Sequence, residues 1–397
     1  MGRALAIAMV SAVALAGCQV AQTATTVATS RNPEAALKQT LRQQGESYAR
    51  NPQAIVRDAQ ALKRDFDQVM DLLSGNVRKT WGKKEVKVPT RTHYVKYTQN
   101  YRSRAEVDFD AGVITVETVD EADPRASLRN AIVTTVLTPD DPRSVDLFTD
   151  RAVTLTSDRP PYLLGLVVDQ DDHPIRTPAE AEAFADRMLL AAGTRQVELE
   201  SGLKTALFVK FAMVRNFQNK QAEKYRQAVA RFSQQYRVSQ SLIYAIIKTE
   251  SNFNPFAVSP APAYGMMQLV PTSGGREAYK RARGLDEPPS KEVLFDAESN
   301  IELGTAYLSV LSYNHLEAIA NPVAREYCVI SAYNTGPGNV LRTFSKDRVA
   351  AVNAINGMQP PGVYDRLRTQ LPHEETRQYL VKVVGWRKQF VTRAGDG

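Results

Sequence analysis

The sequence predicts an α+β fold, in which an amino-terminal α/β domain with an antiparallel sheet precedes a mainly α-helical domain. Two observations predict it. Helical segments and segments of alternating apolar and polar residues are interspersed over 33–216, whereas strand signals almost vanish over 217–397. There, helical patterns follow one another between Pro- and Gly-rich loops. The chain of 397 residues is long enough for two or three folded units.

The composition is typical of a globular protein, with 43% hydrophobic and 23% charged residues. The formal charge of +7 tolerates an anionic partner but identifies none. Two cysteines cannot form a disulfide framework, and four scattered histidines predict no metal cluster. Lys and Arg do not cluster densely with aromatic residues, which disfavours a nucleic-acid binder.

The first residues have the properties of an export signal. Arg3 precedes an apolar run over 4–16, which is shorter than the about 20 residues that span a bilayer. The run ends in Leu15-Ala16-Gly17-Cys18, which resembles the bacterial lipobox, where the cysteine is lipidated and becomes the first mature residue. We therefore expect a lipoprotein signal peptide over 1–17.

A lipid on Cys18 would hold the protein on a membrane without a spanning helix. Residues 18–32 are small and polar and are expected to form a lipidated tether. By resemblance to Gram-negative lipoproteins, Gln19 in place of Asp favours the outer membrane. The expected location is the periplasmic face of that membrane.

The first segments after the tether predict a helix and a hairpin. The pattern over 33–74 is helical, and Gly75 is expected to end the helix. Residues 106–117 predict a hairpin that turns at Gly112 and has one packed and one solvated face. Further expected elements are a helix that begins at Asp123-Pro124, a buried strand over 162–168, a helix with a capping box at Thr177 and Glu180, and a strand over 203–214.

The second domain is read as a series of helices. We expect them over 220–236, 239–251, 291–313, 322–333 and 373–391. Cys328 lies on an apolar helical face and is expected to be an inert thiol in the core.

Glu250 has an unusual position for an acid. It follows Ile246 and Ile247 by one turn and so falls on the apolar face of its predicted helix, near the negative end of the helix dipole. Both effects disfavour the ionised form and should raise the pKa of Glu250, as a general acid requires. On its own this is weak, because most Glu residues at helix ends are solvated.

Three later motifs carry groups that bind sugars without charge, namely amides, tyrosine hydroxyls and aromatic faces. They are Tyr264-Gly265-Met266-Met267-Gln268, Ser331-Ala332-Tyr333-Asn334-Thr335-Gly336-Pro337-Gly338, and Leu371-Pro372-His373-Glu374-Glu375-Thr376-Arg377-Gln378-Tyr379-Leu380. Each is weak alone, since Tyr and Met more often pack in a core.

Together with Glu250-Ser251 and in this order, the motifs resemble the lytic transglycosylase family related to goose-type lysozyme. The family usually has Leu where Met266 stands, and Pro260 and Pro262 stiffen a loop that is often built from small residues. Segments of the amino-terminal domain, such as Trp81-Gly82 and 94–98, resemble membrane-bound members of this family. The resemblance implies a lysozyme-like catalytic domain over 217–397.

The resemblance also implies an activity on peptidoglycan. The family cleaves the β-1,4 bond between N-acetylmuramic acid and N-acetylglucosamine without water and leaves a 1,6-anhydromuramyl end. Glu250 would be the general acid and then the base, and no metal or organic cofactor is needed. The residues implied to bind the glycan strand are Ser251, Met266, Met267, Gln268, Tyr333, Asn334, Glu375 and Tyr379.

Other interpretations remain open from the sequence. A hydrolytic lysozyme would use the same acid, and a non-catalytic peptidoglycan-binding lipoprotein would keep the groove but gain nothing from a desolvated acid. Structural roles are also open for Ser251 (a hydrogen bond at the helix end), for Met266 and Met267 (packing) and for Glu375 (a helix amino terminus).

Overall fold

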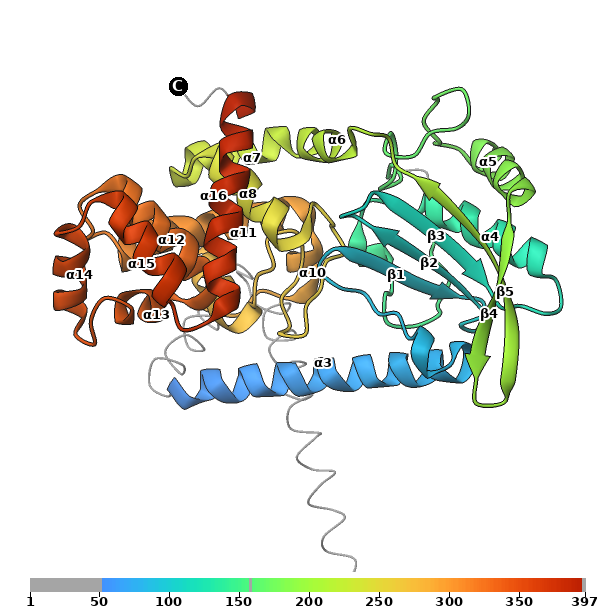
Figure 1. Ribbon diagram of the computed structural model, residues 1–397, viewed down its shortest axis with the longest axis horizontal. Helices are drawn as coiled ribbons and strands as arrows, with labels where there is room; N and C mark the ends of the chain where they lie inside the picture. The colour runs from blue at the N-terminus through green and yellow to red at the C-terminus, as the bar shows by residue number, and fades with distance from the viewer. Residues whose placement is uncertain (1–51, 157–158, 395–397) are drawn as a thin grey trace, which may run out of the picture.

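The computed structural model describes residues 52–156 and 159–394 and confirms the α+β fold. A five-stranded antiparallel sheet with the order β1-β2-β3-β5-β4 forms the first part, and helices form the second (Figure 1). The expected signal peptide over 1–17 and the tether over 18–32 lie outside the described residues. Within the described part, none of the helices has the length and apolar character needed to cross a membrane.

The elements of the first part alternate between helix and strand. In chain order they are α3 (Pro52–Trp81), η1 (Lys83–Glu85), β1 (His93–Thr98), β2 (Ser103–Asp108), β3 (Val113–Thr118), α4 (Pro124–Leu137), η2 (Pro142–Ser144), α5 (Pro178–Leu190), β4 (Gly193–Leu199) and β5 (Gly202–Ala212).

The second part is helical throughout its described length. Its elements are α6 (Phe217–Lys224), α7 (Arg226–Tyr236), α8 (Gln240–Ser251), η3 (Pro271–Gly275), α9 (Arg276–Arg283), α10 (Lys291–Phe295), α11 (Ala297–Val310), η4 (Leu311–His315), α12 (Pro322–Thr335), α13 (Pro337–Arg342), α14 (Arg348–Asn356), α15 (Pro360–Gln370) and α16 (Glu374–Ala394).

Helices cover both faces of the sheet. Leu128 and Ile132 of α4 join the core on one face, whereas Leu73 and Trp81 of α3 pack on the other. Figure 1 shows α3 as a long helix that extends from the sheet toward the helical part, and it contacts both β4 and η3. The α3 helix therefore links the two parts of the molecule.

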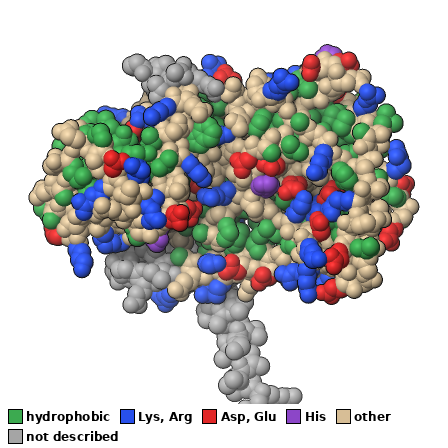
Figure 2. All heavy atoms as spheres, in the orientation of Figure 1, with side chains coloured by type: hydrophobic (Ala, Val, Ile, Leu, Met, Phe, Trp, Pro, Cys, Tyr) green, Lys and Arg blue, Asp and Glu red, His purple; other side chains and the backbone are tan. Residues whose placement is uncertain are grey.

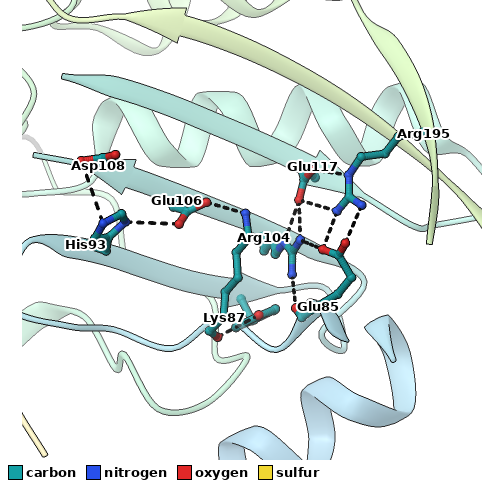
Figure 3. Close-up of polar contacts among 9 residues, drawn as sticks. Glu85, Lys87, His93, Arg104, Glu106, Asp108, Glu117 and Arg195 are labelled. Atoms are coloured by element: carbon teal, nitrogen blue, oxygen red, sulfur yellow. Dashed lines mark hydrogen bonds and ion pairs between the residues drawn. The ribbon is translucent and has the colours of Figure 1, made fainter. Parts of the chain in front are cut away.

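The predicted hairpin is confirmed as β2 and β3, with Asp108 opposite Val113. The expectation of one solvated face is wrong, because Arg104 and Glu117 on that face are only 1% and 3% exposed. Figure 3 shows how they are paired: Arg104 donates to Glu117 at 2.7 Å, and Arg195 bridges Glu117 and Glu85. An ion network that is buried at Arg104 and Glu117 and partly exposed at Glu85 and Arg195 thus replaces the solvent contact.

The predicted end of the first helix at Gly75 is also wrong. The helix continues to Trp81 because Val77 and Trp81 are fully buried on the same face as Leu73. The glycine that follows the helix is Gly82, which has φ +78° and donates its amide to Arg78 O at 2.9 Å.

The segment 162–168 is buried as expected but is not a strand. Gly165 has φ +72°, and the flanking amides form short-range turns, such as Leu164 N to Pro161 O at 3.0 Å. The apolar pattern therefore reports burial and not extended backbone. The helix after Asp123, the capping box at Thr177 and the strand that becomes β5 are confirmed.

The helical expectations hold with two interruptions. Residues 220–236 divide into α6 and α7 at Tyr225, and 291–313 divides at Asp296, whose carboxylate caps α11 by accepting from Ser299 N. The helix over 239–251 is confirmed as α8, capped by Ser239. Cys328 is fully buried, as predicted, and burial raises the pKa of its thiol to about 12.

Candidate active site

Glu250 lies in the last turn of α8 with its side chain 7% exposed. Burial raises the pKa of Glu250 to about 7, Glu375 adds to the rise, and Tyr379 and Arg91 oppose it. The helical phase explains the burial, because Ile246 and Ile247 one turn earlier are fully buried. Both the apolar position and the raised pKa follow the prediction from sequence.

A groove of about 430 Å³ passes Glu250. Tyr333 and Asn334 line it from the end of α12, Gln268 from the loop before η3, and Glu375 from the first turn of α16. The structure therefore brings together side chains from all four sequence motifs. They meet because α16 packs against both α8 and α12 in a single core.

The loop that carries Gln268 has a conformation that requires glycine. Gly265 has φ +75°, and a Cβ atom there would lie 2.4 Å from both Asn300 Nδ2 and Leu294 O. Asn300 holds the loop, since its Oδ1 accepts from Met267 N at 2.7 Å and its Nδ2 donates to Tyr264 O at 2.9 Å.

Two polar groups of the site have fixed orientations. The Tyr333 hydroxyl donates to Met267 O at 2.8 Å, and the Thr376 hydroxyl donates to Asn334 Oδ1 at 2.6 Å. Gln268 Nε2 donates to Gly265 O at 2.8 Å, which leaves Oε1 buried without a partner among the described residues. An unpaired buried acceptor is costly.

Four of the predicted sugar-binding residues do not line the groove, namely Ser251, Met266, Met267 and Tyr379. Ser251, Met266 and Met267 are fully buried. The Ser251 hydroxyl lies 2.8 Å from Met266 O and 3.2 Å from Ile247 O. Met267 packs on Gly304, where a Cβ would come within 2.3 Å of the Met267 sulfur. These residues support the groove wall from behind.

Tyr379 and Glu375 differ in exposure. Tyr379 is 4% exposed, and its hydroxyl makes no hydrogen bond of regular geometry with the described residues. It is nevertheless close enough to Glu250 to lower the pKa of that carboxyl. The Glu375 side chain is 70% exposed at the rim of the groove.

Sequence reasoning missed Arg91, which precedes β1 and reaches the groove from the sheet-containing part. It also missed Tyr307 of α11, whose ring lies 5.4 Å from that of Tyr333. No local signal marks Arg91, because its neighbours Thr90 and Thr92 belong to no motif. A second cavity, of about 810 Å³, shares Arg91 and Ser259 with the groove and continues beside α3 and α16.

Two groups of side chains could hold a metal ion, although the scattered histidines predicted no such cluster. They are His93 with Asp108 and Asp110, and Asp169 with Asp171 and His173. Neither group lines the groove at Glu250. On the face drawn in Figure 2, acidic and basic side chains are interspersed, without a large patch of one sign.

Comparisons with known proteins agree with this geometry. Residues 55–224 match the family model described as the membrane-bound lytic murein transglycosylase C, N-terminal domain, and residues 227–356 match the transglycosylase SLT domain. A membrane-bound lytic murein transglycosylase C from Serratia proteamaculans is 43% identical over 86% of this chain and 93% of its own length. One from Shigella sonnei is 44% identical over 83% of this chain and 90% of its own.

Among solved structures, the 70 kDa soluble lytic transglycosylase from Escherichia coli is 26% identical, over 43% of this chain and 25% of that chain, with a TM-score of 0.33. The family models together span most of the described residues, and the relatives match over nearly their whole length. The chain therefore belongs to the membrane-bound lytic murein transglycosylase C family and is a lytic transglycosylase that acts on peptidoglycan.

Proposed function

We propose that Glu250 is the general acid and then the base of the transglycosylase reaction. Its proton passes to the glycosidic oxygen as the bond from that oxygen to C1 of the muramyl sugar breaks. The Glu250 carboxylate then accepts the proton of the C6 hydroxyl, whose oxygen bonds to C1 and closes the 1,6-anhydro ring. No water is consumed, and Glu250 returns to its protonated form.

The observation that carries this proposal is the burial of Glu250 at the groove, with a pKa of about 7. A group with such a pKa can both donate and accept a proton near neutral pH. Among the described residues that line the groove, the other carboxylate is Glu375, which is well exposed and faces Arg91. We therefore assign stabilisation of C1 to the N-acetyl oxygen of the substrate, in place of a second protein carboxylate.

We assign direct glycan contacts to the residues that face the groove. Gln268 lines the groove, and Tyr333 and Asn334 present groups whose orientation is fixed by Met267 O and Thr376. Tyr379 does not line the groove and would act through Glu250, whose pKa it lowers by hydrogen bonding. Ser251, Met266 and Met267 would act by supporting the loop.

The test is a Glu250→Gln variant assayed on purified murein sacculi. Gln keeps the shape of the side chain and loses the transferable proton, so turnover should fall by at least about 100-fold while glycan binding persists. Glu374→Gln is the matched control, because Glu374 is exposed in the same region but does not line the groove.

Mass spectrometry of the released muropeptides distinguishes the alternatives. Products lighter by one water than hydrolytic fragments support the transglycosylase mechanism. Hydrated reducing ends would mean a lysozyme. Near wild-type cleavage by the Gln variant would refute the role of Glu250.

We also propose that the mature chain is anchored by lipid on Cys18 at the periplasmic face of the outer membrane, after removal of 1–17. The lipobox-like sequence supports this, as does the name of the relatives, which are membrane-bound. The tether over 18–32 would lead into domains at 33–216 and 217–397, a boundary that falls between the end of β5 at Ala212 and the start of α6 at Phe217. A Cys18→Ser variant should leave the membrane fraction; continued membrane association would contradict the anchor.

A further inference from the structure

Arg91 stands between two carboxylates of the site. Its Nη1 atom is 3.9 Å from Glu250 Oε2 and 3.7 Å from Glu375 Oε1. Among the described residues that line the groove, Arg91 is the one cation. Its side chain is 44% exposed, so the positive charge lies at the mouth of the pocket in which Glu250 is buried.

The loop that follows α8 holds the Arg91 backbone in place. Asn254, which is fully buried, donates from Nδ2 to Arg91 O at 3.1 Å. Val258 N also donates to Thr90 O at 3.4 Å. The backbone of Arg91 is therefore held by the loop that directly follows the helix of Glu250, although Arg91 itself belongs to the sheet-containing part.

We propose that Arg91 is a positioning residue through which the amino-terminal domain takes part in the reaction, by stabilising the Glu250 carboxylate that exists between the two proton transfers. The inference rests on the proposed role of Glu250. A buried carboxylate without a counter-ion is costly, and the guanidinium reduces that cost at the step where the proton has left. Glu375 also lies beside the Arg91 guanidinium and competes with Glu250 for its positive charge, which restrains Arg91 at the rim of the groove.

The groups that face Glu250 make opposing contributions. Burial raises the pKa of Glu250, Tyr379 and Arg91 lower it, and Glu375 raises it again. Tyr333 of α12 also lies close to Glu250. Burial is the main cause that raises the pKa of the Tyr333 hydroxyl, and the charge of Glu250 raises it further. Removal of Arg91 and removal of Glu375 should therefore shift the titration of Glu250 in opposite directions.

The experiment compares pH–rate profiles of wild type, Arg91→Gln and Glu375→Gln on soluble peptidoglycan fragments at low ionic strength. A general acid must be protonated, so activity falls as pH rises through its pKa. Without Arg91, this alkaline limb should move up by about 0.5 to 1 pH unit, since the guanidinium is partly exposed and solvent screens its charge. The plateau rate should fall by about three- to tenfold, because the carboxylate is less stable. Without Glu375, the limb should move down.

Two further variants separate charge from structure. Arg91→Lys keeps the cation and should restore most of the wild-type profile. Arg143→Gln removes another ion pair between the two parts, because Arg143 of the sheet-containing part lies 3.5 Å from Asp296 of the helical part. It leaves the groove unchanged, so its alkaline limb should match wild type.

Opposite shifts in Arg91→Gln and Glu375→Gln, with Arg143→Gln unchanged, support the inference. A limb that stays within about 0.2 pH unit of wild type in Arg91→Gln, with anhydro products still formed, overturns it and leaves the role of Glu250 intact. Added salt should shrink both shifts, because it screens exposed charges. Failure of the proposed function itself would appear separately, as an active Glu250→Gln variant.

Discussion

The burial that equips Glu250 for acid–base chemistry also costs stability. The pKa of Glu250 is about 7 in the folded protein, because burial raises it from the ordinary value of 4.5 for a glutamate. Between these two values the folded state holds a proton that the unfolded state has released, so the free energy of unfolding falls as pH rises from 4.5 to 7. Above that range the destabilisation is complete.

We therefore expect Glu250→Gln to raise the thermal midpoint at pH 8 and to change it little at pH 4. The difference in pKa corresponds to a gain of up to about 3 kcal/mol, because Gln carries no charge to desolvate. Calorimetry at both pH values measures it. An equal effect at pH 4 and pH 8 would show that titration of Glu250 is not the cause.

At the residue scale, the sequence predicted a site residue whose burial depends on one helix, and it missed a site residue whose contacts join the two parts of the molecule. Glu250 was found because the phase of α8 follows from neighbouring isoleucines. Arg91 was not, because its contacts with Glu250 and Glu375 depend on how the two parts pack. The motifs pointed to Ser251, Met266 and Met267, but a motif does not distinguish a residue that lines the groove from one that is buried behind its lining.

At the scale of single elements, glycine positions show how context decides a helix end. Gly75 and Gly82 both follow helical pattern residues, but a Cβ at Gly75 would meet nothing within 4 Å, whereas one at Gly82 would lie 2.0 Å from Glu198 O. Gly75 is inside α3 and Gly82 is outside it with φ +78°.

Gly75→Ala should therefore stabilise the protein by about 0.5–1 kcal/mol, because Ala is the better helix former and the site is open. Gly82→Ala, its matched control, should destabilise through both the backbone conformation and the clash. Denaturant midpoints report both. A loss of stability in Gly75→Ala would mean that α3 ends near Gly75 in solution.

The strands that the sequence missed share a physical reason. Strand β4 is at the edge of the sheet, and its burial pattern is mostly exposed or intermediate with Val197 fully buried, so apolar alternation is weak. Strand β1 is the other edge, and its Lys96 is buried by donating to Asp146 O and Thr149 O. Segment 162–168 shows the opposite case. It was predicted to be a strand because it is apolar, but it is buried without pairing to a neighbouring strand.

At the scale of the whole molecule, acid should affect the two parts differently. Hydrogen bonds from His93, opposed by burial, lower the pKa of Glu106 to about 2, with Lys87 adding to the effect. In Glu117, burial alone would raise the pKa, but hydrogen bonds and charge from Arg195 and Arg104 outweigh it and lower the pKa. These lowered pKa values supply stability that is present above the ordinary glutamate pKa of 4.5 and is lost as pH falls toward the folded-state pKa.

We expect acidification from about pH 6 to about pH 3 to weaken the sheet-containing part more than the helical part, where protonation of Glu250 works in the opposite direction. Hydrogen exchange measured on peptides from β2 and β3 would report on the sheet-containing part, and exchange on peptides from α8 would report on the helical part. Greater loss of protection in α8 than in the sheet would contradict the expectation. Glu117→Gln should reduce the acid sensitivity of the sheet.

The placement of the two tryptophans of the chain has a spectroscopic consequence. Trp81 is fully buried with the Arg104 guanidinium 4.0 Å from its ring, whereas Trp386 is half-buried in the wall of the large cavity, 4.8 Å from Lys248 Nζ. Each part of the protein thus contains one tryptophan in its own surroundings. Trp81→Phe and Trp386→Phe would give single-tryptophan proteins that need no added label. The emission maximum of Trp386→Phe would report on the sheet, and that of Trp81→Phe on the cavity beside the catalytic groove.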